Sequence, residues 1–291
     1  MTKGWKVLDL INATKAFFEK KGIVDTARLD AELLLADVLG CERIELYVRF
    51  DEEVAEPRLS EFRDMVRRRG ERRPVAHILG RCEFFSREFE LTPDVMVPRP
   101  ETETLVKLTL AELAQGPLTL ADIGTGSGVI AVTIALARPE ATVYATDISE
   151  PALAVARRNV EKHQVADRVE LLAGDLVEPL AERGLETALD AVVSNPPYVG
   201  GSERERLAPE VTEHEPAVAL FSGADGTEHT TRLLAAAPAF LKPGGLLALE
   251  LNEFTADRIR AAAEDIDALD AVRIERDLRG ADRVLLARRK E

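Results

Sequence analysis

The strongest indication of fold in this 291-residue chain is the segment Ala121-Asp122-Ile123-Gly124-Thr125-Gly126-Ser127-Gly128-Val129-Ile130-Ala131. It reads as a short apolar strand, a glycine-rich turn and the start of a helix. Glycine lets backbone approach a ligand where a Cβ atom would clash, and a helix N-terminus offers unpaired N–H groups. The turn predicts a carboxylated nucleotide as its ligand. Its third glycine comes one residue early for the dinucleotide pattern, which needs glycine where Val129 stands, so the spacing disfavours NAD.

Two strands further along the chain lead into acidic residues. The apolar run 141–146 ends at Asp147, where a carboxylate can accept two hydrogen bonds from a ribose diol. After a predicted helix at about 151–163, the strand 169–173 leads into Gly174-Asp175-Leu176, which can border a base. Open α/β sheets bind ligands at the carboxyl ends of their strands, so these turns are expected to meet in one nucleotide site.

A fourth turn, Asn195-Pro196-Pro197-Tyr198, follows the apolar run 189–194. A planar NH2 group has two donors and little basicity, so a catalyst has to accept its hydrogens and hold its flat face. The Asn195 amide oxygen and the Pro196 carbonyl can accept those hydrogens, and the Tyr198 ring can lie against the plane. The two prolines stiffen the turn by fixing φ. The pattern predicts a site that alkylates nitrogen, and an ordinary proline turn is the alternative.

The rest of the chain reads as two domains joined by a short linker. Glycines stop predicted helices at 5–21, 27–39 and 57–69, and the alternating segment 82–92 predicts a hairpin. Strand and helix then alternate, which predicts a parallel sheet, and 272–275 with 283–287 predict an antiparallel hairpin at the sheet edge. The expected domains are a helical bundle at 1–80, a β-hairpin linker at 81–98 and an α/β domain at 99–291.

Charge and composition restrict the partners. Residues 1–80 contain 15 basic and 15 acidic residues, so the net charge of −14 lies in residues 81–291. An acidic α/β domain is a poor docking surface for a phosphate backbone, so no stable nucleic acid binding is expected. The cluster between Arg67 and Arg73 is either a solvated helix end or a partner contact.

Other classes of site are not expected. Neither the cysteines, Cys41 and Cys82, nor the four histidines have metal-ligand spacing, so no metal is predicted. No apolar run is long enough to cross a bilayer, and the first six residues lack the apolar core of a signal peptide. We therefore expect a cytoplasmic protein without a membrane partner. We also expect a monomer, since nothing in the sequence suggests a coiled coil.

With these motifs the chain resembles the class I methyltransferases that use S-adenosyl-L-methionine, and specifically the HemK family of release factor glutamine methyltransferases. The resemblance covers nearly the whole length. It implies a Rossmann-like, doubly wound α/β sheet with a C-terminal antiparallel hairpin, preceded by a small N-terminal helical domain that recognises the substrate protein. Besides the turns above, it rests on the segments 30–35, 73–80, 97–103, 215–220 and 242–245.

The resemblance also implies the chemistry. S-adenosyl-L-methionine would be the cofactor, and the partners would be peptide chain release factors, methylated on the glutamine of their Gly-Gly-Gln tripeptide. The alternative is a DNA or RNA adenine methyltransferase, because the Asn-Pro-Pro-Tyr turn is shared with such enzymes. The expected cofactor-binding residues are Gly124, Thr125, Gly126, Ser127, Gly128, Asp147, Asp175, Leu176 and Asn195, and the expected catalytic residues are Asn195, Pro196, Pro197 and Tyr198.

Three residues near the acceptor keep two interpretations. Arg99, Glu101 and Thr102 form either a lid beside the acceptor or a helix cap and salt bridges. The charge split adds a hypothesis of its own: the acidic domain is complementary to a basic face on the release factor.

Overall fold

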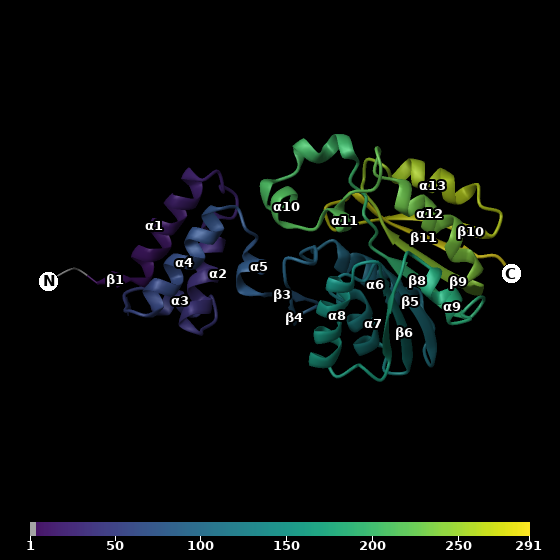
Figure 1. The fold of residues 1–291 in the computed structure, drawn as a ribbon, viewed down its shortest axis with the longest axis horizontal. Helices are drawn as coiled ribbons and strands as arrows, with labels where there is room; N and C mark the ends of the chain where they lie inside the picture. Colours follow the sequence, from purple (N-terminus) through teal and green to yellow (C-terminus); the bar gives the residue numbers. More distant parts are fainter. Residues whose placement is uncertain (1–3) are drawn as a thin grey trace. The chain divides into compact units, whose positions relative to one another are not determined.

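The computed structural model describes residues 4–291, which fall into two compact units. Unit 1 holds the chain up to Arg81 together with the segment Ala208–His214, and unit 2 holds Cys82–Leu207 and Glu215–Glu291. Figure 1 labels their elements. Within residues 4–291, none of the helices has both the length and the apolar character needed to span a bilayer.

Unit 1 is a small helical bundle. Its core is formed by apolar side chains of the three longest helices, with Phe18, Leu34, Leu35 and Phe62 almost fully buried. The first helix begins at Val7 rather than at residue 5, because the two residues before it pair antiparallel with a second short strand. The elements are β1 (Trp5–Lys6), α1 (Val7–Lys20), α2 (Ala27–Leu39), α3 (Glu45–Val48), β2 (Glu53–Val54), α4 (Arg58–Gly70), α5 (Val75–Leu79) and α10 (Pro209–His214).

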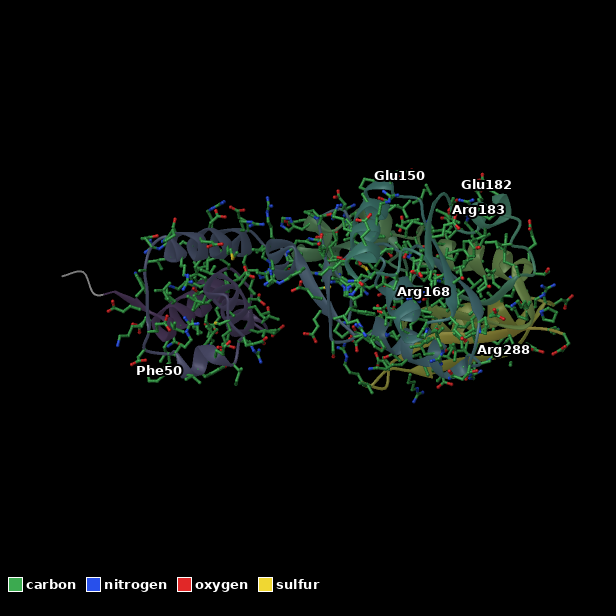
Figure 2. All side chains as sticks on the ribbon, turned by 90° about the horizontal axis from the view of Figure 1, so that it is seen from below. Phe50, Glu150, Arg168, Glu182, Arg183 and Arg288 are labelled. Atoms are coloured by element: carbon green, nitrogen blue, oxygen red, sulfur yellow. The ribbon has the colours of Figure 1, made fainter. Side chains whose placement is uncertain are left out.

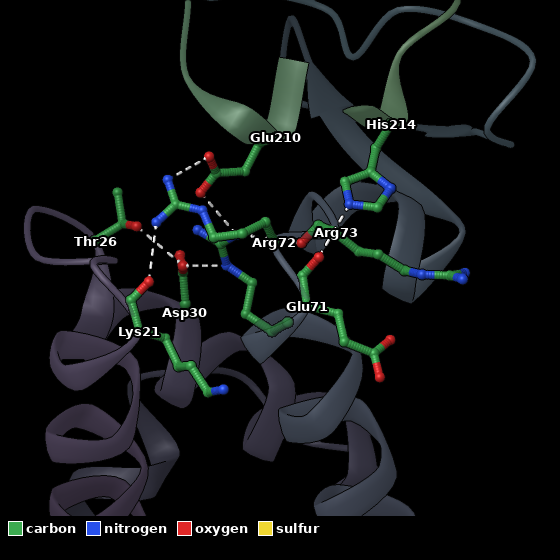
Figure 3. A network of polar contacts seen from close by, with 9 residues as sticks. Lys21, Thr26, Asp30, Glu71, Arg72, Arg73, Glu210 and His214 are labelled. Carbon is green, nitrogen blue, oxygen red and sulfur yellow. Dashed lines mark hydrogen bonds and ion pairs between the residues drawn. The ribbon is translucent and has the colours of Figure 1, made fainter. Parts of the chain in front are cut away.

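The segment Ala208–His214 belongs to unit 1 and forms ion pairs with the end of α4 and the residues just after it (Figure 3). Arg69 is only 5% exposed, and its guanidinium bonds Asp30 Oδ2 at 2.7 Å and Glu210 Oε1 at 2.9 Å. Arg72 bonds the other Glu210 oxygen at 2.6 Å. A buried cation needs such partners, since an uncompensated charge in a protein interior is strongly destabilising. Two arginines of the basic cluster therefore hold a distant segment of the chain.

Other members of that cluster are solvated. Arg67 is exposed and pairs with Asp64 at 2.7 Å and Glu71 at 2.8 Å on its own helix or just beyond it. The cluster thus combines an ordinary exposed helix end with a buried anchor.

Unit 2 is built on a seven-stranded sheet in the order β10-β11-β9-β8-β5-β6-β7. The five strands from β9 to β7 in this order run parallel, and β11 and β10 complete the edge in antiparallel pairing. This confirms the predicted doubly wound α/β sheet with a C-terminal antiparallel hairpin. The strands are β5 (Leu118–Ile123), β6 (Ala141–Asp147), β7 (Val169–Ala173), β8 (Leu189–Ser194), β9 (Leu241–Glu250), β10 (Leu269–Arg276) and β11 (Asp282–Arg289).

Helices cover both faces of this sheet. Side chains alternate across β5, so Leu120 belongs to one core cluster while Ala121 and Ile123 belong to the other. The elements around the sheet are β3 (Arg81–Phe84), β4 (Arg87–Glu90), α6 (Thr102–Glu112), α7 (Val129–Ala137), α8 (Glu150–Lys162), α9 (Glu178–Glu182), the 3-10 turn η1 (Gly201–Arg206), α11 (Ala217–Leu220), α12 (Glu228–Ala236), the 3-10 turn η2 (Ala237–Ala239) and α13 (Ala256–Glu264).

The predicted hairpin before the sheet is present as the antiparallel pair β3–β4. Its aromatic residues Phe84 and Phe89 are buried in the core cluster that also contains side chains of α6 and α7. The hairpin therefore packs as part of the core of unit 2.

Charged side chains such as Glu150, Glu182 and Arg183 lie at the outside of unit 2 (Figure 2).

Candidate functional site

A pocket lies in unit 2 where the strand order reverses. The chain runs from β5 outward to β6 and β7, then returns to β8 on the other side of β5. Ligands of open α/β sheets bind at such a point, outside the carboxyl ends of the strands. The pocket encloses about 1030 Å³ of space, part of it open to solvent, which suits a nucleoside-sized ligand. The predicted residues that line it are Gly124, Thr125, Gly126, Ser127, Asp147, Asp175, Leu176, Asn195 and Pro197.

The glycine turn presents bare backbone to this pocket. Gly124 and Gly126 have φ of +71° and +56°, a left-handed conformation that only glycine adopts easily. A Cβ atom added to either one would meet no protein atom within 4 Å. Because both glycines line the pocket, the space that their missing side chains leave is space for a ligand.

Gly128 does not line the pocket, and a different contact requires glycine at this position. A Cβ atom there would lie 3.3 Å from the Cα and Cβ atoms of Ala156 on α8. The third glycine of the turn therefore permits the close approach of α8 to the start of α7.

Asp147 stands at the end of β6 and faces the glycine turn. Its two carboxylate oxygens accept hydrogen bonds from the Gly126 N–H at 2.8 Å and the Ser149 N–H at 2.9 Å. Burial raises the pKa of this carboxyl, and the backbone donors oppose that rise. The carboxylate is thus held in one orientation at the pocket wall, with lone pairs left for a further donor.

The structure adds Asp122, which the sequence analysis did not single out. It is fully buried on β5, and its Oδ2 accepts bonds from Thr125 Oγ1 at 2.6 Å and Ala131 N at 3.1 Å. Burial raises its pKa to about 7. Asp122 thus ties the glycine turn to the helix behind it. In the sequence, the indication of this role is an acidic residue near the end of an otherwise apolar strand.

Asp175 and Leu176 border the pocket on the β7 side. The Asp175 carboxylate is paired with Arg232 of α12. Leu176 has φ of +48°, and its carbonyl accepts a hydrogen bond from Thr146 Oγ1 at 2.9 Å. The hydrogen bond holds this turn against the end of β6, and the ion pair connects it to α12.

The Asn-Pro-Pro-Tyr turn begins directly after β8. The Ser194 hydroxyl donates to the Ile123 carbonyl at 2.6 Å, which ties the end of β8 to the end of β5. Asn195 and Pro197 line the pocket, whereas Pro196 and Tyr198 do not. The Tyr198 hydroxyl instead points toward Glu250 Oε1, 3.5 Å away, and burial raises the tyrosine pKa.

The residues with two interpretations make polar contacts within unit 2. Arg99 pairs with the buried Glu215 at 2.7 Å, and Glu101 pairs with Arg279. Thr102 begins α6, lines the pocket and accepts a hydrogen bond from Asn195 Nδ2 at 3.2 Å. The salt-bridge interpretation therefore holds for the first two, and the third contacts the predicted acceptor site.

Known proteins resemble the chain in both parts. A family model described as the PrmC N-terminal domain matches residues 9–80, and one described as the methyltransferase small domain matches residues 102–221. Among solved structures, a methyltransferase from Pyrococcus furiosus covers 71% of this chain and 90% of its own, with 24% identity and a TM-score of 0.52. A 16S rRNA methyltransferase of T. thermophilus in complex with AdoMet and guanosine covers 72% and 50%, with 20% identity and a TM-score of 0.51. These structures share the fold.

Two curated relatives extend the similarity to nearly the full length. A release factor glutamine methyltransferase of Rhodopirellula baltica is 44% identical over 97% of this chain and 95% of its own length. One from Geobacter sulfurreducens is 38% identical over 97% and 96%. At these identities over nearly the full length of both proteins, the chain belongs to the release factor glutamine methyltransferase family.

Proposed function

We propose that this protein transfers a methyl group from S-adenosyl-L-methionine to the side-chain amide nitrogen of the glutamine in the Gly-Gly-Gln tripeptide of peptide chain release factors. The observation that carries the proposal is that Asn195 lines the same pocket as the glycine turn and Asp147. A planar-amide acceptor site and a nucleoside site are therefore contiguous. The names of the curated relatives supply the class of substrate.

The residues of the pocket fit the cofactor. The open space over Gly124 and Gly126 admits the methionine part close to backbone N–H groups. Asp147 is oriented by two backbone donors and can accept from a ribose diol. Asp175 and Leu176 border the place for the adenine, and Thr125, Ser127 and Asn195 complete the set proposed to bind the cofactor. Gly128 contributes by allowing the helix to pack.

When bound, S-adenosyl-L-methionine supplies an electrophilic methyl group on a positively charged sulfur. The chain has to hold a weak nucleophile in line with it, because the amide lone pair is delocalised into the carbonyl. Asn195 Oδ1 and the Pro196 carbonyl are proposed to accept the two hydrogens of the substrate NH2 group. Positive charge builds on that nitrogen during transfer, so both oxygens stabilise the transition state more than the neutral amide. Holding the amide nitrogen in line with the methyl group supplies the rest of the rate enhancement. The proton of the methylated nitrogen can then leave to water.

The remaining parts have proposed roles. Pro197 keeps the turn stiff, and the Tyr198 ring packs on the plane of the substrate amide with its hydroxyl directed at Glu250. The helical bundle of residues 1–80 recognises the release factor. Residues 81–98 form the hairpin linker, which packs with the methyltransferase domain, and residues 99–291 form that domain except for Ala208–His214, which belongs to the helical unit. We propose a cytoplasmic monomer that forms no stable complex with nucleic acid.

The test is transfer of labelled methyl from S-adenosyl-L-methionine to a purified release factor. Matched reactions contain the same factor with its Gly-Gly-Gln changed to Gly-Gly-Ala, or unmethylated duplex DNA. Label on the native factor alone supports the proposal. Label on DNA, or on neither substrate while the cofactor binds, would overturn it.

A further inference from the structure

A buried polar chain lies behind Asn195 within unit 2. Asn195 Nδ2 donates to Thr102 Oγ1 at 3.2 Å, and the Thr102 hydroxyl acts in turn on the carboxyl of Glu250, at the end of β9, as a donor that lowers the pKa of that group. Thr102 is 2% exposed and Glu250 is fully buried. Strand β9 lies next to β8, so the carboxyl group stands beside the strand that leads into Asn195.

The row of hydrogen-bonding groups from Asn195 through Thr102 to Glu250 has a direction, which is set by the number of protons that each group carries. A hydroxyl has one proton, and an ionised carboxylate can only accept. With Glu250 ionised, the Thr102 proton points at Glu250, and an oxygen lone pair of Thr102 remains for Asn195. That lone pair accepts an N–H, so Nδ2 of Asn195 faces Thr102 and Oδ1 faces the opposite way.

This direction matters for the proposed reaction. The two ends of an Asn amide have nearly the same shape, so only hydrogen bonds decide which end faces a ligand. If the amide were reversed, Nδ2 would meet the substrate NH2, and donor would oppose donor. We infer that Glu250, acting through Thr102, is a positioning residue that presents Asn195 Oδ1 to the substrate amide. The inference deepens the proposed function and rests on it.

Neighbouring groups are consistent with this role. Apart from Thr102, the polar and charged groups that act on Glu250 are Tyr198, Arg283 and Arg99. Burial raises the Glu250 pKa to about 7, and Thr102 and both arginines oppose that rise. A protonated Glu250 could donate to Thr102 and reverse the chain. Within residues 4–291, the Tyr198 hydroxyl lies 3.5 Å from Glu250 Oε1 and Oε2 has no hydrogen-bond partner, so the carboxylate keeps lone pairs that can accept the Thr102 proton.

Helix α6 supplies a matched control. Thr109 is also fully buried on α6, and its Oγ1 has no hydrogen-bond partner within residues 4–291. Thr109→Val and Thr102→Val make the same chemical change on one helix, and only the second interrupts the chain to Asn195.

The experiment measures single-turnover methyl transfer to a release factor, with cofactor affinity measured separately by calorimetry. Thr102→Val should lower the rate constant by about 10- to 100-fold, since a misdirected transition-state acceptor is nearly a lost one. Cofactor affinity should stay within about 2-fold. Thr102→Ser, which keeps the hydroxyl, should recover most of the rate. Glu250→Gln should slow transfer and abolish the rise in rate with pH that follows ionisation of Glu250 in the native protein.

A second readout does not depend on turnover. In the free protein, the Asn195 side-chain NH2 resonances, assigned by their loss in Asn195→Ala, should shift in Thr102→Val and stay unchanged in Thr109→Val. Equal transfer rates and equal resonances for the two valine variants would overturn the inference even if Glu250→Gln failed to fold. Loss of transfer by the native enzyme on release factor would instead overturn the proposed function, while the resonances would still test the orientation of Asn195.

Discussion

At the scale of single residues, the pocket combines groups whose contacts separate binding from chemistry. Asp147 is held by backbone N–H groups of the glycine turn and of the helix that follows it. Asn195 is held by a side chain, Thr102. Removal of the Asp147 side chain should therefore change cofactor binding, whereas removal of the Asn195 side chain should change the rate of methyl transfer.

Asn195→Ala should largely preserve cofactor affinity, because the glycine turn and Asp147 still bind the cofactor, and should lower the transfer rate constant by about 100- to 1000-fold. The reason is that one of two proposed acceptors for the charge on nitrogen is lost, and comparable hydrogen-bond groups in other active sites contribute that much. Calorimetry with S-adenosyl-L-methionine and single-turnover transfer measure the two steps. Near-normal turnover by this variant would remove Asn195 from the mechanism.

Asp147→Ala should weaken cofactor binding by about 10- to 100-fold, because hydrogen bonds to an ionised carboxylate contribute about 1.5 to 3 kcal/mol. Titration calorimetry measures the dissociation constant. Asp167→Ala is the control, since its side chain is 75% exposed and lies outside the pocket. Equal affinities for the two variants would mean that Asp147 does not hold the ribose.

At the scale of elements, the glycine turn between β5 and α7 does two jobs. Gly124 and Gly126 leave ligand space, whereas Gly128 lets α8 approach. Positive φ alone does not distinguish them, since all three are left-handed. The distinction comes from what a Cβ atom would meet.

Gly126→Ala should cost about 1 to 2 kcal/mol of stability from its left-handed backbone, and should also weaken cofactor binding because the new methyl group enters the pocket. Gly184→Ala is a close control. Gly184 also has positive φ and open space around an added Cβ atom, but it follows α9 and does not line the pocket. Urea unfolding should show similar losses of unfolding free energy for both variants. Calorimetry should show weakened binding for Gly126→Ala alone, and equal binding by both would argue against the turn as the cofactor cradle.

At the scale of the whole molecule, buried acids should make stability depend on pH. Burial raises the pKa of Asp122 from an unfolded value near 3.8 to about 7 in the folded protein. Between those values the folded state binds the extra proton, so this residue's contribution to the free energy of unfolding falls as pH rises from about 4 to about 7.

Asp122→Asn should therefore flatten the stability curve over that range, relative to the native protein. The difference in slope should be at most about 1.4 kcal/mol per pH unit. Urea unfolding at several pH values measures it, with Asp167→Asn as the exposed control. A variant whose curve stays parallel to the native one from pH 4 to 7 would show that Asp122 is not protonated in the folded state.

The net charge predicts a second whole-molecule effect. If the acidic residues 81–291 meet a basic face of the release factor, the KM for the factor should rise with salt because exposed charges are screened. The rate constant at saturation should change little, since the chemistry occurs in a pocket. Methylation measured across a salt range in which the fold is intact tests this, and an unchanged KM would exclude steering by charge.

Much of the fold was predictable from local signals. The glycine turn, the acids at strand ends and the Asn-Pro-Pro-Tyr turn are each contiguous in sequence, and their chemistry depends on residue type and spacing. The rule that parallel strands bind ligands at their carboxyl ends then suffices to bring them together. The helix at 27–39 and the strand at 189–194 could be read to the residue, because apolar pattern and glycine or turn residues bound them.

Other features of the site depend on contacts between residues that lie far apart in the sequence. Thr102 meets Asn195 across 93 positions, and Arg69 meets Glu210 across 141. Gly128 is required by Ala156 on another helix, and Asp122 gains its role from burial. Composition and periodicity report which face of an element is buried, but not which side chain of another element lies against it. Local sequence patterns therefore specify the sheet and the turns that form the pocket, while packing between distant residues specifies which side chains hold those turns in place.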